Sequence, residues 1–145
     1  MAQRRSFGRT SCLLAGLLLS AILCSCISPQ HFKPAQDALD TFHQRLRAHE
    51  FEKILKDATP EFRRSMGDDA GRVFFSRVSN TLGAPVSSNP ITVRENHMPA
   101  GVFIQAIYQT HFEKGDAQEN FTWRVEAGTP HLAGYQVSSP LFLTH

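Results

Sequence analysis

Apolar side chains recur every three or four residues between positions 35 and 46 of the chain. These positions are Ala35, Ala38, Leu39, Phe42 and Leu46, with polar residues in most of the intervals. This period is typical of a helix that buries one face against a core. Pro34 suits the first turn of such a helix, where its missing N–H loses no hydrogen bond. We therefore expect the first helix to begin at Pro34.

Further helical signals follow up to residue 83. A second, short helical segment starts near Phe51. Thr59 and Pro60 have the character of an N-cap and a first helical residue, and Gly67 is expected to end that turn. Asp68 or Asp69 can cap a third helix, which closes at Gly83. The pattern predicts about three helices.

The period changes after Pro85, where residues 84–90 are interpreted as a connector. Alternating or strand-like segments follow at residues 91–95, 102–113, 121–126 and 132–139. Turn signals separate them at 99–101, 114–117 and 128–130. Helices followed by strands in separate blocks are typical of the α+β class. We expect a four-stranded antiparallel meander that packs on the first helix.

The N-terminus has the layout of an export signal. Arg4, Arg5 and Arg9 precede an apolar run from Leu13 to Leu23, the charged and apolar regions of a signal peptide. A transmembrane span needs roughly 20 apolar residues, and this run is shorter. Residues 1–25 are therefore predicted to be a signal peptide.

The end of that run looks like a bacterial lipobox. In Leu23-Cys24-Ser25-Cys26, an aliphatic residue stands at −3 and a small one at −1. The competing site, Cys24, would place bulky Leu23 at −1, so we expect lipidation of Cys26. A plain secreted chain and an uncleaved anchor are the alternatives.

This assignment divides the chain into a signal (1–25), a lipidated N-terminus and tether (26–33) and one domain (34–145). Acyl chains on Cys26 would give strong membrane retention. Ile27 at position +2 is not Asp, which in a proteobacterium points to the outer membrane, facing the periplasm.

Removal of the signal changes the charge and the cysteine count. The whole chain has 15 Lys+Arg and 13 Asp+Glu, a formal charge of +2. Without Arg4, Arg5 and Arg9 the counts become 12 and 13, or −1, which gives no reason to expect a nucleic-acid partner. Cys12 and Cys24 leave with the signal, and Cys26 carries lipid, so no free thiol remains.

The helices-then-sheet order resembles the cystatin-like cone fold shared with nuclear-transport-factor-like domains. Within that group, the chain is similar to a bacterial family of lipoprotein-borne domains of unknown function, number four thousand and nineteen of the usual series. The residues that carry the resemblance are Phe75–Gly83, Pro99–Phe103, Glu119 with Trp123-Arg124-Val125, and Leu132–Val137. The resemblance spans Ala35 to Val137 and implies a fold but no established activity.

No set of catalytic or metal-binding residues stands out in the sequence. The chain lacks H-E-x-x-H, G-x-S-x-G and Gly-rich phosphate-binding motifs, so we expect no metal and no cofactor. His43 and His49 fall on different sides of a helix and cannot share a metal. Three other histidines, His97, His111 and His131, are interpreted as exposed or half-exposed strand residues.

Aromatic residues are the best binding candidates. If residues 114–117 close a simple hairpin, Tyr108 and Trp123 fall opposite or nearly opposite each other on one face. Tyr135 lies on the next strand, on that face or the other. In a cone fold, the inner face of the sheet and the first helix enclose the core or a pocket, and Tyr and Trp suit the wall of a small-ligand cavity.

The sequence thus favours a non-enzymatic lipoprotein domain that binds a small apolar ligand or an envelope protein. One alternative is a small cone-fold enzyme of isomerase or dehydratase type, with a His or Asp base in its cavity. His97 and His111 are then the first candidates for the base. Another alternative is a structural component of the envelope.

Overall fold

The computed structural model describes residues 29–143. The predicted signal peptide and the predicted lipidation site, Cys26, lie outside the described residues. The helices are α1 (Pro29–Arg47), α2 (Phe51–Lys56), α3 (Pro60–Met66) and α4 (Asp68–Leu82). The strands are β1 (Pro85–Met98), β2 (Gly101–Phe112), β3 (Gly115–Glu126) and β4 (Thr129–Ser138), followed by the short 3-10 helix η1 (Pro140–Leu143).

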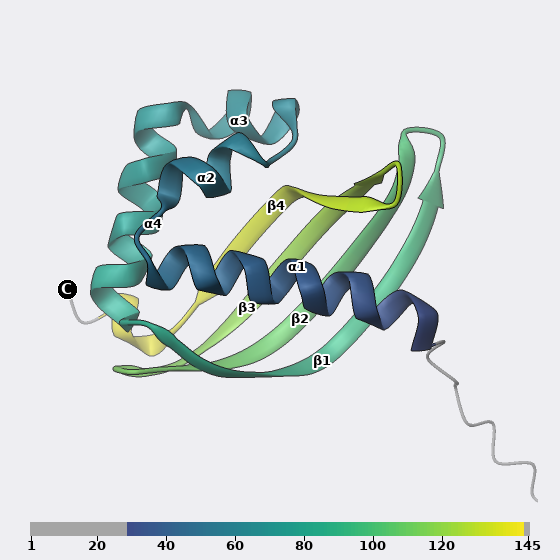
Figure 1. The fold of residues 1–145 in the computed structure, drawn as a ribbon. Coiled ribbons are helices and arrows are strands. Elements are labelled where there is room, and N and C mark those ends of the chain that lie inside the picture. The colour runs from purple at the N-terminus through teal and green to yellow at the C-terminus, as the bar shows by residue number, and fades with distance from the viewer. Residues whose placement is uncertain (1–28, 144–145) are drawn as a thin grey trace, which may run out of the picture.

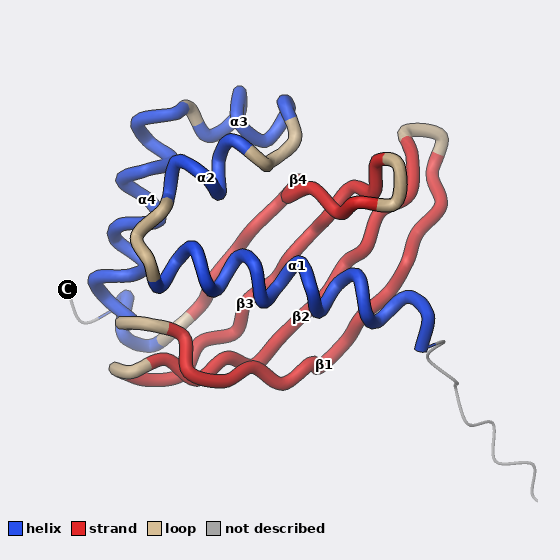
Figure 2. The backbone as a smooth tube through the Cα atoms, viewed as in Figure 1, coloured by secondary structure: helices blue, strands red, loops and turns tan. Residues whose placement is uncertain are grey.

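The expected α+β class and the four-stranded antiparallel meander are confirmed, with strand order β1-β2-β3-β4. Figure 1 shows α1 crossing one face of a sheet that curves around it. Figure 2 shows α2, α3 and α4 grouped toward one end, with the β1–β2 and β3–β4 turns at the other. The beginning of α1 therefore lies at the end that carries these two turns.

The helical region holds four helices where about three were expected. Thr59 caps α3 as predicted, since its side chain accepts a hydrogen bond from Phe62 N over 3.3 Å. Gly67, with φ of 72°, separates α3 from α4 and is also the N-cap of α4. The prediction that Asp68 or Asp69 caps this helix is wrong. Both residues lie in its first turn, where a negative charge complements the helix dipole.

Helix α1 begins at Pro29, earlier than the expected start at Pro34. Pro34 is instead inside the helix. A proline near the beginning of a helix removes one backbone hydrogen bond, and this one does not stop the helix.

The prediction that residues 84–90 form a connector is wrong, because β1 already begins at Pro85. β1 is an edge strand, paired with β2 alone, from Pro85↔Phe112 to Met98↔Gly101. Prolines are tolerated on an edge strand, and the pairing shifts register between Pro90 and Thr92. The first half of β1 contains two prolines and lacks apolar alternation, so the sequence pattern did not predict a strand there.

The expected packing of the sheet on the first helix is also wrong as stated, because the core is shared with α4. Leu39, Phe42 and Leu46 of α1 are buried, and so are Phe75, Val78 and Leu82 of α4. The rings of Phe42 and Phe121 lie 5.1 Å apart, and those of Phe75 and Tyr135 lie 5.8 Å apart. Two helices from different parts of the chain thus complete one aromatic core.

Candidate functional site

The most unusual side chain of the core is Glu119, which is fully buried. Ala117, Glu119, Phe121 and Trp123 alternate along β3 and all point to the covered face of the sheet. A buried carboxylate is tolerated only where hydrogen bonds or an opposite charge replace the lost water. Glu119 must therefore have polar partners inside an otherwise apolar core.

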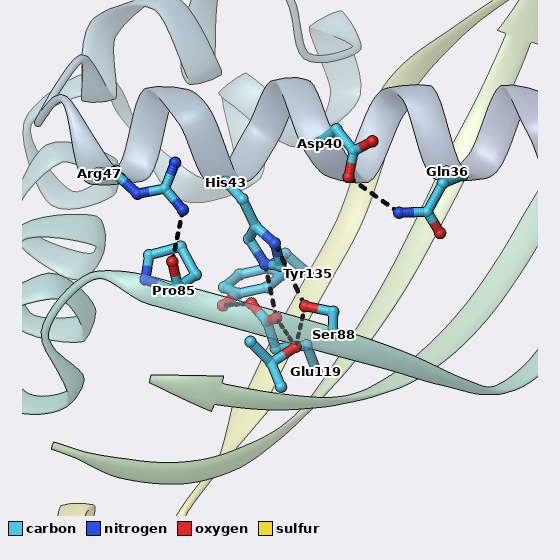
Figure 3. Close-up of polar contacts among 9 residues, drawn as sticks. Gln36, Asp40, His43, Arg47, Pro85, Ser88, Glu119 and Tyr135 are labelled. Atoms are coloured by element: carbon cyan, nitrogen blue, oxygen red, sulfur yellow. Dashed lines mark hydrogen bonds and ion pairs between the residues drawn. The ribbon is translucent and has the colours of Figure 1, made fainter. Parts of the chain in front are cut away.

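Three side chains bind the two carboxylate oxygens of Glu119, and Figure 3 labels two of them, His43 and Tyr135. The Tyr135 hydroxyl donates to Oε1 over 2.7 Å, and Thr110 Oγ1 donates to Oε2 over 2.6 Å. His43 Nε2 lies 2.8 Å from Oε2. Since an ionised carboxylate only accepts hydrogen bonds, Nε2 of His43 is the donor.

Ser88 extends this group to the edge of the sheet. Its Oγ lies 2.9 Å from Thr110 Oγ1 and 3.5 Å from His43 Nδ1. We call Ser88, Thr110, Glu119, Tyr135 and His43 the Glu119 cluster. The cluster takes one residue from each strand and one from α1, so it fixes the helix to the whole width of the sheet.

The environment of the cluster changes the acidity of Tyr135. Burial raises the pKa of the Tyr135 hydroxyl well above 10, and the negative charge of Glu119 and the hydrogen bond to it act in the same direction. Tyr135 is therefore a neutral hydrogen-bond donor throughout the physiological pH range.

The cluster reaches the surface through His43 and Ser88. Both line a groove of about 260 Å³ between α1 and β1, together with Gln36, Asp40, Arg47 and residues 85–87. Arg47 donates to the Pro85 carbonyl over 2.5 Å, and Gln36 donates to Asp40 over 2.9 Å. The His43 side chain is only 10% exposed, so the groove touches one edge of the imidazole ring.

A larger cleft lies between α1 and the beginning of β4, with a volume of about 590 Å³. We call it the α1–β4 cleft. Its floor is formed by buried apolar residues: Phe42, Ile54, Trp123 and Leu132. Its rim is polar and charged, with contributions from α1 between Lys33 and Arg45, from the end of α2 and from the turn between β3 and β4.

The charged groups of this rim are paired with one another. Lys33 Nζ lies 3.0 Å from Asp37 Oδ2, and Arg45 Nη2 lies 2.5 Å from Asp57 Oδ2. His131 Nδ1 lies 3.0 Å from the carbonyl oxygen of Asp57. Opposite formal charges thus balance around the opening.

The rings of the three predicted binding residues all pack against Phe121, at centroid distances of 4.8 to 6.1 Å, but the residues do not line one pocket. The expected pairing of Tyr108 with Trp123 is wrong: Tyr108 pairs with Glu119, and Trp123 pairs with Ile104. The turn consists of residues 113 and 114, since Phe112 pairs with Gly115, whereas a loop at 114–117 would shift the register by four residues. Side chains alternate between the two faces along a strand, so a register shift of an even number of residues leaves each side chain on its face. Tyr108 and Trp123 therefore both still point to the core.

Of these three residues, Trp123 alone lines the α1–β4 cleft, and Tyr135 belongs to the Glu119 cluster. Tyr108 is completely buried, and within residues 29–143 its hydroxyl is the one buried polar side-chain atom without a hydrogen-bond partner. Burial and the charge of Asp40 raise the pKa of Tyr108 to about 12.

The histidines proposed as bases are surface residues. The side chains of His97 and His111 are 74% and 58% exposed and pair with Glu95 and Asp116. The buried, partnered histidine is His43, whose place in the sequence suggested only a metal ligand. Two signals could have found the cluster: a Glu at an inward position of β3, and a His beside Phe42 on the apolar side of α1.

Within residues 29–143, no three His, Cys, Asp or Glu side chains form a group that could hold a metal ion. None of the described helices has the length and apolar character needed to cross a bilayer. Comparison with known proteins finds no matching family model and no matching curated protein. The family resemblance stays a prediction based on the residues quoted above.

Proposed function

We propose that this protein is a membrane-anchored, periplasm-facing binding module that holds a small, partly apolar molecule in the α1–β4 cleft. The observation that carries the proposal is the cleft itself, about 590 Å³ in volume, with Trp123 in its floor. An apolar floor with a few polar groups at the rim is the usual composition of a small-ligand site. The ligand's apolar part would lie on Trp123 and Phe42, and its polar part would stay at the rim.

The anchor in this proposal is the lipid on Cys26, supported by the lipobox pattern of residues 23–26. Helix α1 begins three residues later, at Pro29. Three residues span at most about 10 Å. A lipid at Cys26 would therefore hold the domain close to the membrane surface. Ile27 at position +2, which is not Asp, favours the outer membrane of a proteobacterium.

The proposed role is non-enzymatic, because the buried carboxylate of Glu119 already makes hydrogen bonds that hold the fold together. Both oxygens of Glu119 accept hydrogen bonds from other side chains, and His43 uses Nε2 to bind it. This arrangement supports a rigid scaffold that positions α1 beside the cleft.

The test uses the fluorescence of Trp123, the single tryptophan of the chain. The chain carrying Cys26→Ala is titrated with N-phenyl-1-naphthylamine, an uncharged aromatic probe that accepts excitation energy from tryptophan. We expect saturable energy transfer from Trp123 to the probe.

Two matched variants decide whether the probe enters the cleft. Ala38→Phe places a large ring in the cleft, and Gln44→Phe places the same ring on an exposed position of α1 that lines no cleft. Binding that is lost in Ala38→Phe and kept in Gln44→Phe supports the proposal. Absence of saturable binding, or equal binding to both variants, would refute it.

A second candidate function, a small cone-fold enzyme, is favoured by the groove above His43. Glu119 orients the imidazole ring through Nε2, which leaves Nδ1 toward Ser88 and the groove. Such an orientation suits a general base. If His43 acts so, the protein should catalyse exchange of carbonyl-adjacent protons of small ketones with deuterium from solvent. That exchange should disappear in His43→Asn, and exchange that persists in the variant would assign it to another group.

A further inference from the structure

The charge balance of the α1–β4 cleft restricts what can occupy it. Lys33 and Arg45 contribute two positive charges to the rim, and Asp37 and Asp57 contribute two negative ones. Each cation is paired with an anion of the same rim. A charged group that entered the cleft would have to separate one of these pairs or remain without a partner. The occupying part of the ligand is therefore uncharged.

The floor of the cleft supplies apolar contact without a hydrogen-bonding pattern. Phe42, Ile54 and Leu132 are each less than 8% exposed and offer only carbon atoms. The Trp123 ring stacks on Phe121 at a centroid distance of 4.8 Å, which keeps it in place under the cleft. Such a surface fits a flexible hydrocarbon as well as a ring, because it requires only the removal of apolar area from water.

The cleft extends along α1 from Lys33 to Arg45, and one end of it lies in the early turns of the helix, where the chain arrives from Cys26. Lys33, Pro34 and Asp37 line it from the early turns of the helix. The turn between β3 and β4, at Gly128–Pro130, lines it from the sheet. Figure 1 shows this turn at the same end of the molecule as the start of α1. With Cys26 held in a bilayer, this end is the one closest to the membrane.

We infer that the α1–β4 cleft takes up a fatty acyl chain of a lipid from the bilayer that anchors the protein. The inference rests on the proposed function and narrows its ligand to one chemical class. An acyl chain meets the requirements above, since it is uncharged and apolar and comes from the surface beside the cleft. Its methylene groups would leave water as they enter the cleft, which favours binding.

Trp123 can report directly on an acyl chain in the cleft. The full, lipidated chain is reconstituted in vesicles of dioleoyl phosphatidylcholine whose acyl double bonds have been brominated, and in matching vesicles without bromine. Bromine quenches tryptophan fluorescence at contact distance. We expect loss of Trp123 fluorescence in the brominated vesicles, because the chain in the cleft lies against the indole ring.

The cleft-filling variant separates this contact from mere closeness to the membrane. Ala38→Phe should keep its fluorescence in brominated vesicles, and Gln44→Phe should be quenched like the unmodified protein. Equal quenching of all three proteins would show that the indole meets the bilayer by another route and would overturn the inference.

The remaining outcomes distinguish this inference from the proposed function. Quenching that is absent in the lipidated chain but present in Cys26→Ala would show that the protein's own acyl chain fills the cleft, which overturns the inference. No quenching in either protein, together with saturable binding of the naphthylamine probe, would overturn the acyl chain and leave the binding module standing. Failure of both measurements would remove both proposals.

Discussion

Among single residues, the buried Glu119 places the strongest constraint on the fold, because its carboxylate needs hydrogen-bond donors inside the core. Its carboxylate has no water contact, and each of its oxygens is occupied by side-chain donors. Hydrogen bonds to charged groups are worth about 1.5–3 kcal/mol each. A donor that binds Glu119 should therefore matter more for stability than an equally buried hydroxyl without a partner.

The two tyrosines provide a matched comparison of this kind. Tyr135→Phe removes a donor to Glu119 and should lower the free energy of unfolding by about 1.5–3 kcal/mol. Tyr108→Phe removes a hydroxyl that has no partner, so stability should stay the same or rise. Urea unfolding measures both changes, and an equal loss in the two variants would contradict the assigned hydrogen bonds.

The tyrosines also predict the response to high pH. The folded chain has two tyrosines in total, with pKa values of about 12 for Tyr108 and well above 10 for Tyr135. A free tyrosine is half ionised near pH 10. At that pH, the native protein should show almost no tyrosinate absorbance, and the unfolded chain in urea should show about half of its full value.

The same shifts give the sign of the stability change. Both pKa values are higher in the folded state, so the stabilisation from neutral tyrosine is complete below pH 10. It is lost as the pH rises from 10 toward the folded-state values, because the unfolded state then releases protons that the native state retains. Stability that is constant across this interval would show that the hydroxyls are not buried.

At the scale of single residues, the sequence predicted the face of the sheet on which a side chain lies better than it predicted the side chain's hydrogen-bond partners. Tyr108 and Trp123 were expected on one inner face, and alternation along their strands was enough to place both there, whereas the face of Tyr135 was left open. The contact between His43 and Glu119 joins residues 76 positions apart. No local pattern encodes such a separation, because the contact arises only when α1 crosses the sheet.

At the scale of elements, the Glu119 cluster links α1 to the four strands. His43 is the helix's contribution, and its bond to Glu119 complements the apolar contacts of Leu39 and Phe42. Loss of this bond should weaken the attachment of the helix to the sheet without removing the helix itself.

A double-mutant cycle at His43 and Glu119 measures this attachment. His43→Leu should destabilise the protein by about 1.5–3 kcal/mol, since it leaves a buried carboxylate short of one donor. Glu119→Leu should also destabilise it, and the double variant should cost less than the sum of the single changes. Additive costs would show that the two side chains do not interact.

The start of α3 gives a second prediction at this scale. Thr59→Ala removes the hydroxyl that accepts from Phe62 N and should lower stability by about 1 kcal/mol. Thr59→Ser keeps the hydroxyl and should retain most of the stability. A serine variant as unstable as the alanine variant would assign the effect to the buried methyl group of Thr59 and not to the cap.

Local signals predicted both ends of α3 and the end of α4, but not the start of α1, the N-cap of α4 or the edge strand. Thr59 acts through a side-chain hydrogen bond, and Pro60, Gly67 and Gly83 act through backbone geometry, all within one helical turn, so their effects are visible in the sequence. The first half of β1 contains Pro85 and Pro90 and is mostly exposed. It is a strand because β2 lies beside it, and that cause is not local.

At the scale of the whole molecule, the described residues form one layer of sheet with helices on one face. The meander order and the α+β class followed from the change of period near residue 85. The α1–β4 cleft did not follow, because its walls come from α1, α2, β3 and β4 and meet only in the folded chain. The proposed lipid anchor differs from the cleft in that its sequence pattern is entirely local, and it lies outside the described residues.

We propose above all that the α1–β4 cleft, with Trp123 in its floor, binds an uncharged apolar group. The chain has one tryptophan, so the indole N–H of Trp123 gives a single signal in a proton–nitrogen correlation spectrum. Addition of N-phenyl-1-naphthylamine should move this signal saturably in the Cys26→Ala chain, and the Ala38→Phe substitution should abolish the movement. A signal that does not move, or that moves equally with Phe at position 38, would contradict the claim.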